Sequence, residues 1–312
     1  MTKTNITILR TVQQVRQWRK NCFVHNYSVG FVPTMGALHQ GHTSLVTQSL
    51  LENDKTIVSI FVNPSQFGPN EDLDKYPRTL DSDLNILTQM FQDKPIDAVF
   101  VPKISEMYPS GINLDVSKQK GAFVTVLGCS EQLEGVTRPG FFRGVATVVT
   151  KLLNVVLPTN IYFGQKDAQQ CVVIKNLVKD LLYDTTVRIM PTQREPNGLA
   201  LSSRNAYLSP QIKQESAIIF QALSSGEAFY NQQKLNKSST PVNAHDIYSQ
   251  VYQTLSNHPH FTIEYIAISH PDTLEDLQFV EPGVGAILST AVRVPKQGSD
   301  QFTRLIDNVV LT

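Results

Sequence analysis

Short, nearly continuous apolar runs recur along the first 190 residues of the chain. They are rich in β-branched residues, which is typical of strands buried on both faces of a sheet. The runs predict five strands, at Val29–Val32, Thr56–Val62, Asp97–Val101, Asn160–Phe163 and Thr186–Met190.

Amphipathic stretches of helical length lie between these runs. They predict helices at His42–Glu52, Leu80–Phe91, Gly144–Val156 and Ala168–Leu181. Strands that alternate with helices of this length indicate an α/β fold with a doubly wound parallel sheet. A further apolar segment, Ala122–Leu127, predicts an additional strand within a long connection.

The pattern changes after about residue 192, so we predict two domains, 1–192 and 193–312. The second has a smaller α+β pattern, with predicted helices at Pro210–Tyr230 and Ala244–Ser256. The polar segment between them, Asn231–Asn243, predicts a mobile loop. Three predicted strands follow, at Thr262–Ser269, Val284–Val294 and Thr303–Leu311.

Composition narrows the class of protein. The 312 residues include 41 % hydrophobic residues, enough for a core, and 27 basic side chains balance 27 acidic ones. A net charge of zero argues against a broad nucleic-acid-binding surface. Three cysteines without a CxxC spacing suggest a reducing compartment. The apolar stretch Val145–Leu157 is too short and too polar to span a membrane, and we see no secretory signal, so we expect a cytoplasmic protein.

Polar segments follow four of the predicted strands. They are Pro33–His42, Asn63–Phe67, Gly164–Asp167 and, after a short loop, Leu201–Asn205. Parallel sheets of this kind bind ligands at the carboxyl ends of their strands. We therefore expect these four segments to lie along the same edge of the sheet.

The first of these segments contains a His-x-Gly-His motif, His39 to His42, where a helix is predicted to begin. Residues three apart share a helix face, and backbone N–H groups there favour anions. Gly36 and Gly41 allow close approach of a nucleotide. Alternatively, the two histidines form a metal pair or a surface turn. A zinc site is disfavoured because the remaining histidines lack a metal-binding spacing with this pair.

Cationic and hydroxyl side chains in the later segments suit phosphate oxygens. Lys166 offers a point charge, and Arg204 offers a forked cation beside Ser202 and Ser203. Asp167 suits a helix N-cap. Asp81 and Asp83 fall in the first turn of a predicted helix, where complementation of the helix dipole competes with magnesium ligation.

Longer motifs identify a family. The segments that carry the resemblance are Pro33–His42 (PTMGALHQGH), Phe61–Phe67 (FVNPSQF), Tyr76–Thr79 (YPRT), Gly164–Gln170 (GQKDAQQ), Gly198–Asn205 (GLALSSRN) and Thr303–Asn308 (TRLIDN). In this order they resemble pantothenate synthetases, within the nucleotidyltransferase superfamily that includes class I aminoacyl-tRNA synthetases. The resemblance implies a Rossmann-like N-terminal domain and a smaller C-terminal domain.

The resemblance also implies an activity. Members join pantoate to β-alanine using ATP, through a pantoyl adenylate, and release AMP and pyrophosphate. They require Mg²⁺, which we expect to be held mainly by the ATP phosphates, and they use no organic cofactor. The expected partners are these small-molecule substrates and a second copy of the chain in a homodimer, with no nucleic acid and no membrane.

Motif positions imply the site residues. Catalytic roles fall to His42, His39, Lys166 and Arg204. The implied ATP site comprises Met35, Gly36, Ala37, Leu38, His39, Gln40, Gly41, His42, Gly164, Gln165, Lys166, Asp167, Gln193, Leu201, Ser202, Ser203 and Arg204. Gln66, Gln170 and Arg138 are expected to bind pantoate or β-alanine. Asp83 is the remaining candidate for a protein ligand of magnesium.

The chain departs from the family pattern at a few positions. Phe141 stands where many members have histidine, Gln165 replaces a common glutamate, and Ala168 replaces a common aromatic residue. Ser82 and Ile86 stand where some members offer magnesium-binding groups. A protein-bound metal site is therefore in question, whereas the phosphate-binding residues are all present.

Two alternatives to this activity follow from the same motifs. One is a nucleotidyltransferase that leaves the nucleotide on a phosphate-bearing acceptor, which the neutral Gln66 disfavours. The other is a nucleotide-binding protein without turnover, which the presence of His42, Lys166 and Arg204 disfavours.

Overall fold

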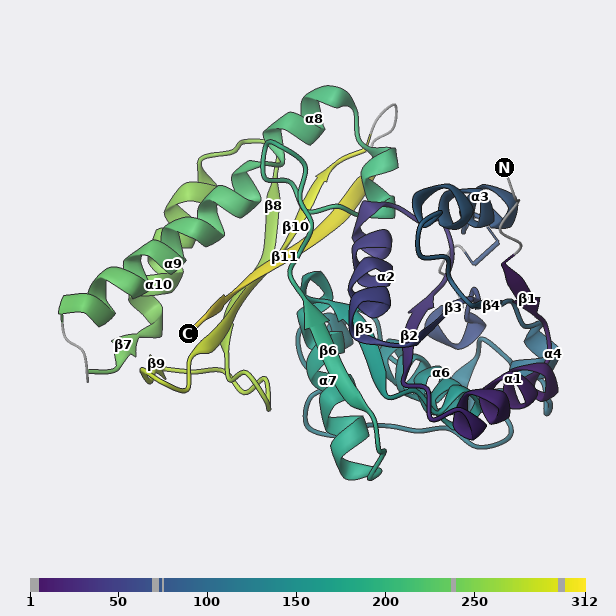
Figure 1. Ribbon diagram of the computed structural model, residues 1–312. Coiled ribbons are helices and arrows are strands. Elements are labelled where there is room, and N and C mark those ends of the chain that lie inside the picture. The colour runs from purple at the N-terminus through teal and green to yellow at the C-terminus, as the bar shows by residue number, and fades with distance from the viewer. Residues whose placement is uncertain (1–5, 69–72, 75, 237–239, 297–300) are drawn as a thin grey trace. The chain divides into compact units, whose positions relative to one another are not determined.

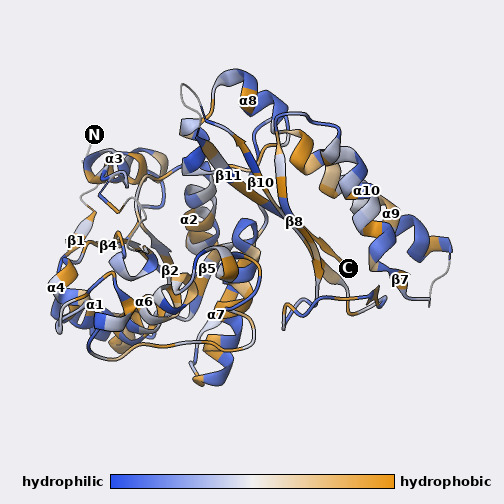
Figure 2. Cartoon of the chain, turned by 180° about the vertical axis from the view of Figure 1, so that it is seen from behind, coloured by the Kyte–Doolittle hydropathy of each residue, from blue (hydrophilic) through white to orange (hydrophobic). Residues whose placement is uncertain are grey.

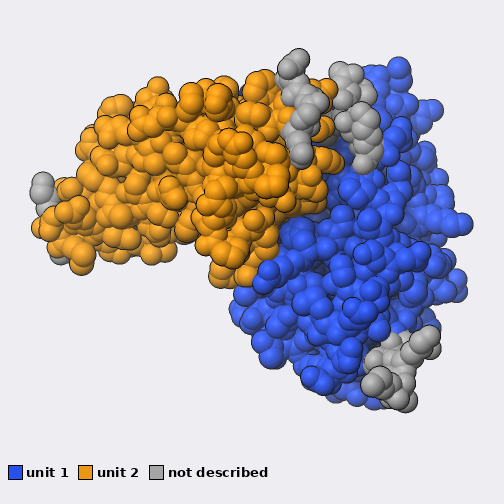
Figure 3. All heavy atoms as spheres, turned by 90° about the horizontal axis from the view of Figure 1, so that it is seen from above, with its two compact units in different colours: residues 1–164, 173–190 blue, residues 165–172, 191–312 orange. Residues whose placement is uncertain are grey.

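The computed structural model describes residues 6–68, 73–74, 76–236, 240–296 and 301–312. The chain forms two compact units (Figure 3). Unit 1 comprises residues 1–164 and 173–190, and unit 2 comprises residues 165–172 and 191–312. The segment 165–172 falls within the predicted first domain, 1–192, but is part of unit 2.

Unit 1 is built on a six-stranded sheet with the order β1-β4-β3-β2-β5-β6, in which every pair of neighbours is parallel. Its strands are β1 (Thr7–Leu9), β2 (Val29–Thr34), β3 (Lys55–Ile60), β4 (Ala98–Phe100), β5 (Asn160–Gly164) and β6 (Thr186–Met190). The five predicted strands are β2 to β6. The short edge strand β1 was not predicted. The order reverses between β2 and β5, and such a switch point is where sheets of this kind bind ligands.

Helices flank this sheet (Figure 1). They are α1 (Val12–Val24), α2 (Gln40–Glu52), α3 (Leu80–Met90), α4 (Ile104–Met107), α5 (Glu134–Thr137), α6 (Phe141–Val156) and α7 (Ala168–Asp180), with α7 shared by both units. The helices α2 and α3 pack through Leu45, Leu50 and Leu87 on a sheet face that includes Val32 and Val58. The predicted doubly wound α/β architecture is confirmed.

Two features of unit 1 differ from the prediction. The segment Ala122–Leu127 is not a strand, because the Val124 N–H donates to the Thr147 hydroxyl of α6 (2.9 Å) instead of to a neighbouring strand. The helix predicted to begin at Gly144 begins at Phe141. Gly144 serves close packing instead, since a Cβ there would lie 2.1 Å from the Ser65 carbonyl oxygen.

Unit 2 combines helices with a three-stranded antiparallel sheet of order β11-β10-β8, which confirms the smaller α+β part. Its elements are α8 (Pro210–Glu215), α9 (Ile218–Asn236), β7 (Val242–Asn243), α10 (Ala244–Ser256), β8 (Thr262–Ser269), β9 (Phe279–Val280), β10 (Ala286–Pro295) and β11 (Phe302–Leu311). The helices α9 and α10 are amphipathic (Figure 2). Their apolar sides share one core with the sheet, including Leu223, Ile247 and Leu288.

The helix predicted at Pro210–Tyr230 is two helices. It breaks at the fully buried Ser216, whose hydroxyl donates to the Ile212 carbonyl (2.6 Å) and ends α8. The predicted loop Asn231–Asn243 is also wrong at its start, because α9 continues to Asn236 through the good helix formers Gln232 to Leu235. Residues 237–239 lie outside the described part of the chain.

Among the described residues, we find no helix that is both long enough and apolar enough to cross a membrane.

Candidate active site

The loop after β2 takes an unusual backbone path. Gly36 and Ala37 both have positive φ angles, +86° and +51°. A left-handed conformation costs a residue with a side chain about 1 kcal/mol or more, so contacts must hold Ala37 in place. The Thr34 hydroxyl supplies one, since it accepts from the Gly36 N–H (3.2 Å) and donates to the Ser59 carbonyl (2.8 Å).

The main contact on this loop is the carboxylate of Asp83, from α3. Its Oδ2 accepts from the Ala37 N–H (3.0 Å) and its Oδ1 from the Leu38 N–H (2.8 Å). The Thr79 hydroxyl also donates to Oδ2 (3.1 Å). Asp83 is 1 % exposed, and a Cβ on residue 36 would lie 3.0 Å from its Oδ2. Asp83 therefore holds the loop in its left-handed path.

This arrangement does not fit a magnesium ligand at Asp83. Both of its oxygens already accept hydrogen bonds from N–H or O–H donors, and such donors disfavour a cation at the same oxygens. Within the described residues, no group of three histidine, cysteine, aspartate or glutamate side chains could hold a metal ion.

The two histidines of the motif cap the N-terminus of α2. His39 is the N-cap, and its Nδ1 accepts from the Gly41 N–H (3.1 Å). The His39 N–H in turn donates to Nδ1 of His42 (3.3 Å), and the ring centroids are 4.2 Å apart. In each ring Nδ1 is an acceptor, so the ring hydrogen is on Nε2. A Cβ on residue 41 would lie 2.8 Å from His39 Cε1, so this packing requires glycine.

Gln66 lies on the short 3-10 helix η1 (Pro64–Gln66) that follows β3. Its Oε1 accepts from the side-chain amide of Asn63 (2.9 Å), and the buried Tyr108 hydroxyl donates to Asn63 Oδ1 (2.6 Å). Burial raises the pKa of Tyr108 to about 12, so this hydroxyl remains a donor at neutral pH. These contacts fix the orientation of the Gln66 amide.

Arg138 contacts the same short helix. Its guanidinium donates to the Gln66 carbonyl (3.1 Å) and lies 3.8 Å from the centroid of the Phe141 ring. Phe141, one of the departures from the family pattern, is thus a stacking partner for Arg138. In unit 1, the structure thus brings together two pairs of predicted site residues. One pair is Gln66 and Arg138, and the other is His39 and His42.

Of the remaining predicted site residues, Met35, Gln40 and Gly164 belong to unit 1, and the others belong to unit 2. Gln165 to Asp167 form the 3-10 helix η3, and the Lys166 ammonium lies 3.6 Å from the Asp167 carboxylate. The Asn308 amide donates to the Gln165 and Lys166 carbonyls, both at 2.9 Å, and the Gln165 amide donates to Asn308 Oδ1 (2.9 Å). Gln170 is half-buried in the first turn of α7.

Gln193 and Leu201 pair across a short antiparallel turn, in which the Leu201 N–H donates to the Gln193 carbonyl (2.9 Å). Ser202 caps the 3-10 helix η4 (Ser203–Tyr207) by accepting from the Arg204 N–H (3.2 Å). The side chain of Arg204 is exposed.

Four residues that support the predicted site were not predicted from the sequence: Asn63, Tyr108, Asp307 and Asn308. Asn63 stands in a quoted motif, as do Asp307 and Asn308, so their positions carried a signal but not a role. Tyr108 has no such signal, because it lies 45 residues from Asn63.

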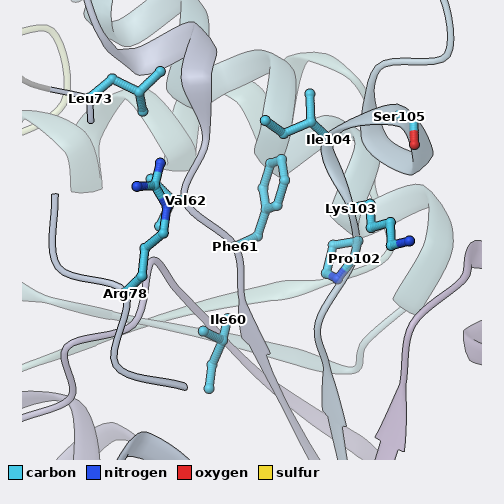
Figure 4. Close-up of a pocket in the computed structure, with 9 residues that line it drawn as sticks. All are labelled: Ile60, Phe61, Val62, Leu73, Arg78, Pro102, Lys103, Ile104 and Ser105. Carbon is cyan, nitrogen blue, oxygen red and sulfur yellow. The ribbon is translucent and has the colours of Figure 1, made fainter. Parts of the chain in front are cut away.

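Unit 1 also has a cavity of about 440 Å³ near the carboxyl ends of β3 and β4 (Figure 4). It is lined by Ile60, Phe61, Val62, Leu73, Arg78, Pro102, Lys103, Ile104 and Ser105. None of the predicted site residues lines it.

Comparison with known proteins identifies the family. The sequence model of the pantoate-beta-alanine ligase family matches residues 7–310. The chain is 44 % identical over 311 residues to a pantoate–beta-alanine ligase of Saccharomyces cerevisiae, covering 97 % of this chain and 99 % of the relative.

Solved structures agree as well. A pantothenate synthetase from Thermus thermophilus superposes with a TM-score of 0.82 at 38 % identity, over 98 % of this chain and 99 % of that one. A pantoate-beta-alanine ligase from Francisella tularensis, complexed with beta-gamma ATP and beta-alanine, has a TM-score of 0.72 at 33 % identity, over 98 % of each chain. From the extent of these matches, the chain belongs to the pantoate–β-alanine ligase family.

Proposed function

We propose that this chain ligates pantoate and β-alanine to pantothenate through a pantoyl adenylate, with His42 and His39 as the donors that act at the ATP phosphates. The observation that carries this assignment is the N-terminus of α2, where both histidines turn Nδ1 to backbone N–H groups. Each neutral ring then carries its hydrogen on Nε2. A helix N-terminus also favours negative charge.

The first half-reaction needs no base. A carboxylate has a pKa near 4, so pantoate is ionised at neutral pH and attacks the α-phosphate directly, with pyrophosphate as the leaving group. The obstacle is repulsion between this anion and the triphosphate. Donors and cations that are held in position before the reaction lower that barrier, and we assign this role to His42, His39, Lys166 and Arg204.

The second half-reaction joins the acyl carbon of the adenylate to the amine of β-alanine, and AMP leaves. We propose that Gln66, Gln170 and Arg138 bind the pantoyl and β-alanine groups. Support comes from the Gln66 amide, which Asn63 holds by its oxygen, so that the orientation of the amide is fixed before substrate arrives. An amide suits the hydroxyl and carboxylate groups of pantoate.

Magnesium, in this proposal, is bound by the phosphates of ATP. The hydrogen bonds at Asp83 support this, since they leave that carboxylate unsuited to a cation. That the protein uses no organic cofactor stays a prediction.

Two further predictions about the protein's context belong to this proposal. We expect a homodimer, which light scattering would test. We expect a cytoplasmic location, which agrees with the three buried thiols of Cys22, Cys129 and Cys171.

Isotope exchange between pyrophosphate and ATP tests the reaction. Exchange that requires pantoate and magnesium, but not β-alanine, is the expected result, because it reports reversible formation of the adenylate. Nucleotide retained in the final product would instead indicate a nucleotidyltransferase with another acceptor. ATP binding without exchange or ligation would indicate a protein that binds nucleotide without turnover.

A further inference from the structure

Two consecutive polar residues of β11, Asp307 and Asn308, have no part in the proposed chemistry, yet both are buried. They are 4 % and 3 % exposed. Successive side chains of a strand point to opposite faces, so one position normally faces away from the core. Buried polar groups are costly unless they are hydrogen-bonded. The partners of this pair therefore indicate why both side chains are buried.

Both polar atoms of the Asn308 side chain form hydrogen bonds with the segment that carries Lys166. Its two amide hydrogens are donated to the carbonyl oxygens of Gln165 and Lys166, both at 2.9 Å. Its oxygen accepts from the Gln165 side chain (2.9 Å). Three hydrogen bonds from one buried side chain fix the path of this short turn, and with it the origin of the Lys166 side chain.

Asp307 holds the segment that leads to Arg204. It forms a bidentate pair with Arg194 (2.6 and 3.0 Å), whose guanidinium also donates to the Gly198 carbonyl (3.1 Å). The Arg194 guanidinium lies 3.6 Å from the centroid of the Phe220 ring. The turn between Arg194 and Ala200 runs directly into Ser202 and the segment that follows it.

The two residues are also joined to each other, because the Asn308 N–H donates to Asp307 Oδ1 (2.8 Å). One strand of unit 2 thus anchors two loops that are separate in sequence. The first loop carries Lys166 and the second leads into η4, which carries Arg204; the proposed function assigns both cations to the ATP phosphates.

We propose that Asp307 and Asn308 are positioning residues for ATP binding, which act by fixing the loops of Lys166 and Arg204 and do not touch substrate themselves. This inference rests on the proposed role of Lys166 and Arg204. It predicts that a change at Asn308 affects ATP more than pantoate.

The test replaces the amide with a carboxylate of the same shape. Asn308→Asp removes both N–H donors. It also places a negatively charged carboxylate oxygen beside the carbonyl oxygens of Gln165 and Lys166. We expect the KM for ATP to rise about tenfold, as for the loss of two neutral hydrogen bonds, with the KM for pantoate changed less than about twofold. Equal changes in both KM values, or a lowered Tm with unchanged kinetics, would overturn the proposal.

Ser289→Ala is the matched control. Ser289 lies directly opposite Asn308 on β10, and its buried hydroxyl has no hydrogen-bond partner among the described residues. Its removal breaks no hydrogen bond to either loop among the described residues. The KM for ATP should therefore stay at the wild-type value.

Lys166→Met separates this inference from the proposed function. If Lys166→Met leaves the KM for ATP unchanged, the proposed role of Lys166 is wrong. If it raises the KM and Asn308→Asp does not, the positioning role alone is wrong. The double variant should bind ATP no more weakly than Lys166→Met, because Asn308 acts through Lys166; additive losses would contradict this.

Arg194→Lys is the second test variant, to be used if Asn308→Asp does not fold. Lysine keeps the charge opposite Asp307 but cannot form two parallel bonds to it. A raised KM for ATP with an unchanged KM for pantoate supports the positioning role of Asp307, and equal effects on both substrates overturn it.

Discussion

Two loops of the molecule are each held by one buried side chain from a distant part of the sequence, but the chemistry of the two is opposite. After β2, Asp83 accepts hydrogen bonds from the N–H groups of Ala37 and Leu38. After β5, Asn308 donates to the carbonyl groups of Gln165 and Lys166. The backbone group that each loop turns inward determines whether an acceptor or a donor can hold it.

The hydrogen bonds that hold the two loops should also differ in strength. Hydrogen bonds to a charged group contribute roughly 1.5–3 kcal/mol each, against roughly 0.5–1.5 kcal/mol for neutral ones. The loop with the strained residue, Ala37, is the one held by the charge. We therefore expect the loop after β2 to be more sensitive to substitution than the turn after β5.

The largest effect should come from the group that the first loop presents. We expect His42→Ala to lower kcat by roughly 10²–10³, as for loss of one preorganised donor. Single-turnover kinetics would measure it, with the exposed His245→Ala as control. A kcat near that of the wild type would contradict the catalytic role of His42. It would also contradict the proposal that the first loop positions a donor for the ATP phosphates.

Loss of the charged contact on the first loop should come next. Asp83→Asn places an amide group where two N–H groups need acceptors, and we expect kcat/KM for ATP to fall by roughly 10- to 100-fold. The control is Asp81→Asn, an exposed carboxylate in the same turn of α3, which complements only the helix dipole.

The same variant distinguishes the two roles considered for Asp83. If Asp83 only holds the loop, the magnesium concentration needed for half-maximal activity should not change in Asp83→Asn. A large increase in that concentration would indicate that Asp83 binds magnesium. The role of Asp83 would then differ from that of Asn308, which only holds its loop.

A third loop extends the comparison to substrate recognition. Gln66 is held by the amide of Asn63, a neutral contact like that of Asn308. We expect Gln66→Ala to raise the KM for pantoate by about tenfold, with a smaller change for ATP. Initial-rate measurements with each substrate varied in turn would check this, and a raised KM for ATP alone would contradict the assignment.

The smallest effect should lie away from all three loops, at Glu52. Hydrogen bonds from Arg188, opposed by burial and supported by Gln48 and Tyr162, lower the pKa of Glu52 to about 2. Its stabilising effect is therefore present above a pH of about 4.5 and is lost as the pH falls toward about 2. Because Arg188 is 44 % exposed, we expect at most about 1 kcal/mol.

Urea unfolding would measure this contribution. Glu52→Gln should be less stable than the wild type at pH 7, and the difference should shrink between pH 5 and pH 3. A difference that is the same at both ends of this range would show that the hydrogen bonds of Glu52 do not depend on its charge. Catalytic constants at pH 7 should be unaffected.

Local patterns were sufficient to predict most of the fold of unit 1. The strands β2 to β5 are mostly buried and carry nearly continuous apolar runs, and that property is visible without knowledge of their neighbours. The same pattern predicted β6, but this edge strand contains Arg188 and has no buried residue. The helix α1 was missed because its buried residues include Arg19, which breaks the apolar pattern. Its start did carry a signal, since Thr11 and Gln14 form a capping box.

The proposed site likewise contains features that local sequence predicts and features that it does not. The spacing of His39 and His42 predicted a shared helix terminus, because that geometry depends only on residues three apart. The contacts of Asp83 and Asn308 could not be predicted, since they join residues 46 and 143 positions apart. Such contacts depend on how the sheets assemble, and no local pattern encodes that.

The place of residues 165–172 has a consequence for protein engineering. Although this segment precedes the rest of unit 2 in sequence, its carbonyl groups are bound by a side chain of the last strand. A polypeptide cut after residue 192 would separate Gln165 and Lys166 from Asn308. Coexpressed halves would regain activity only by complementation, and the N-terminal half alone would expose two carbonyl groups that have lost their donor.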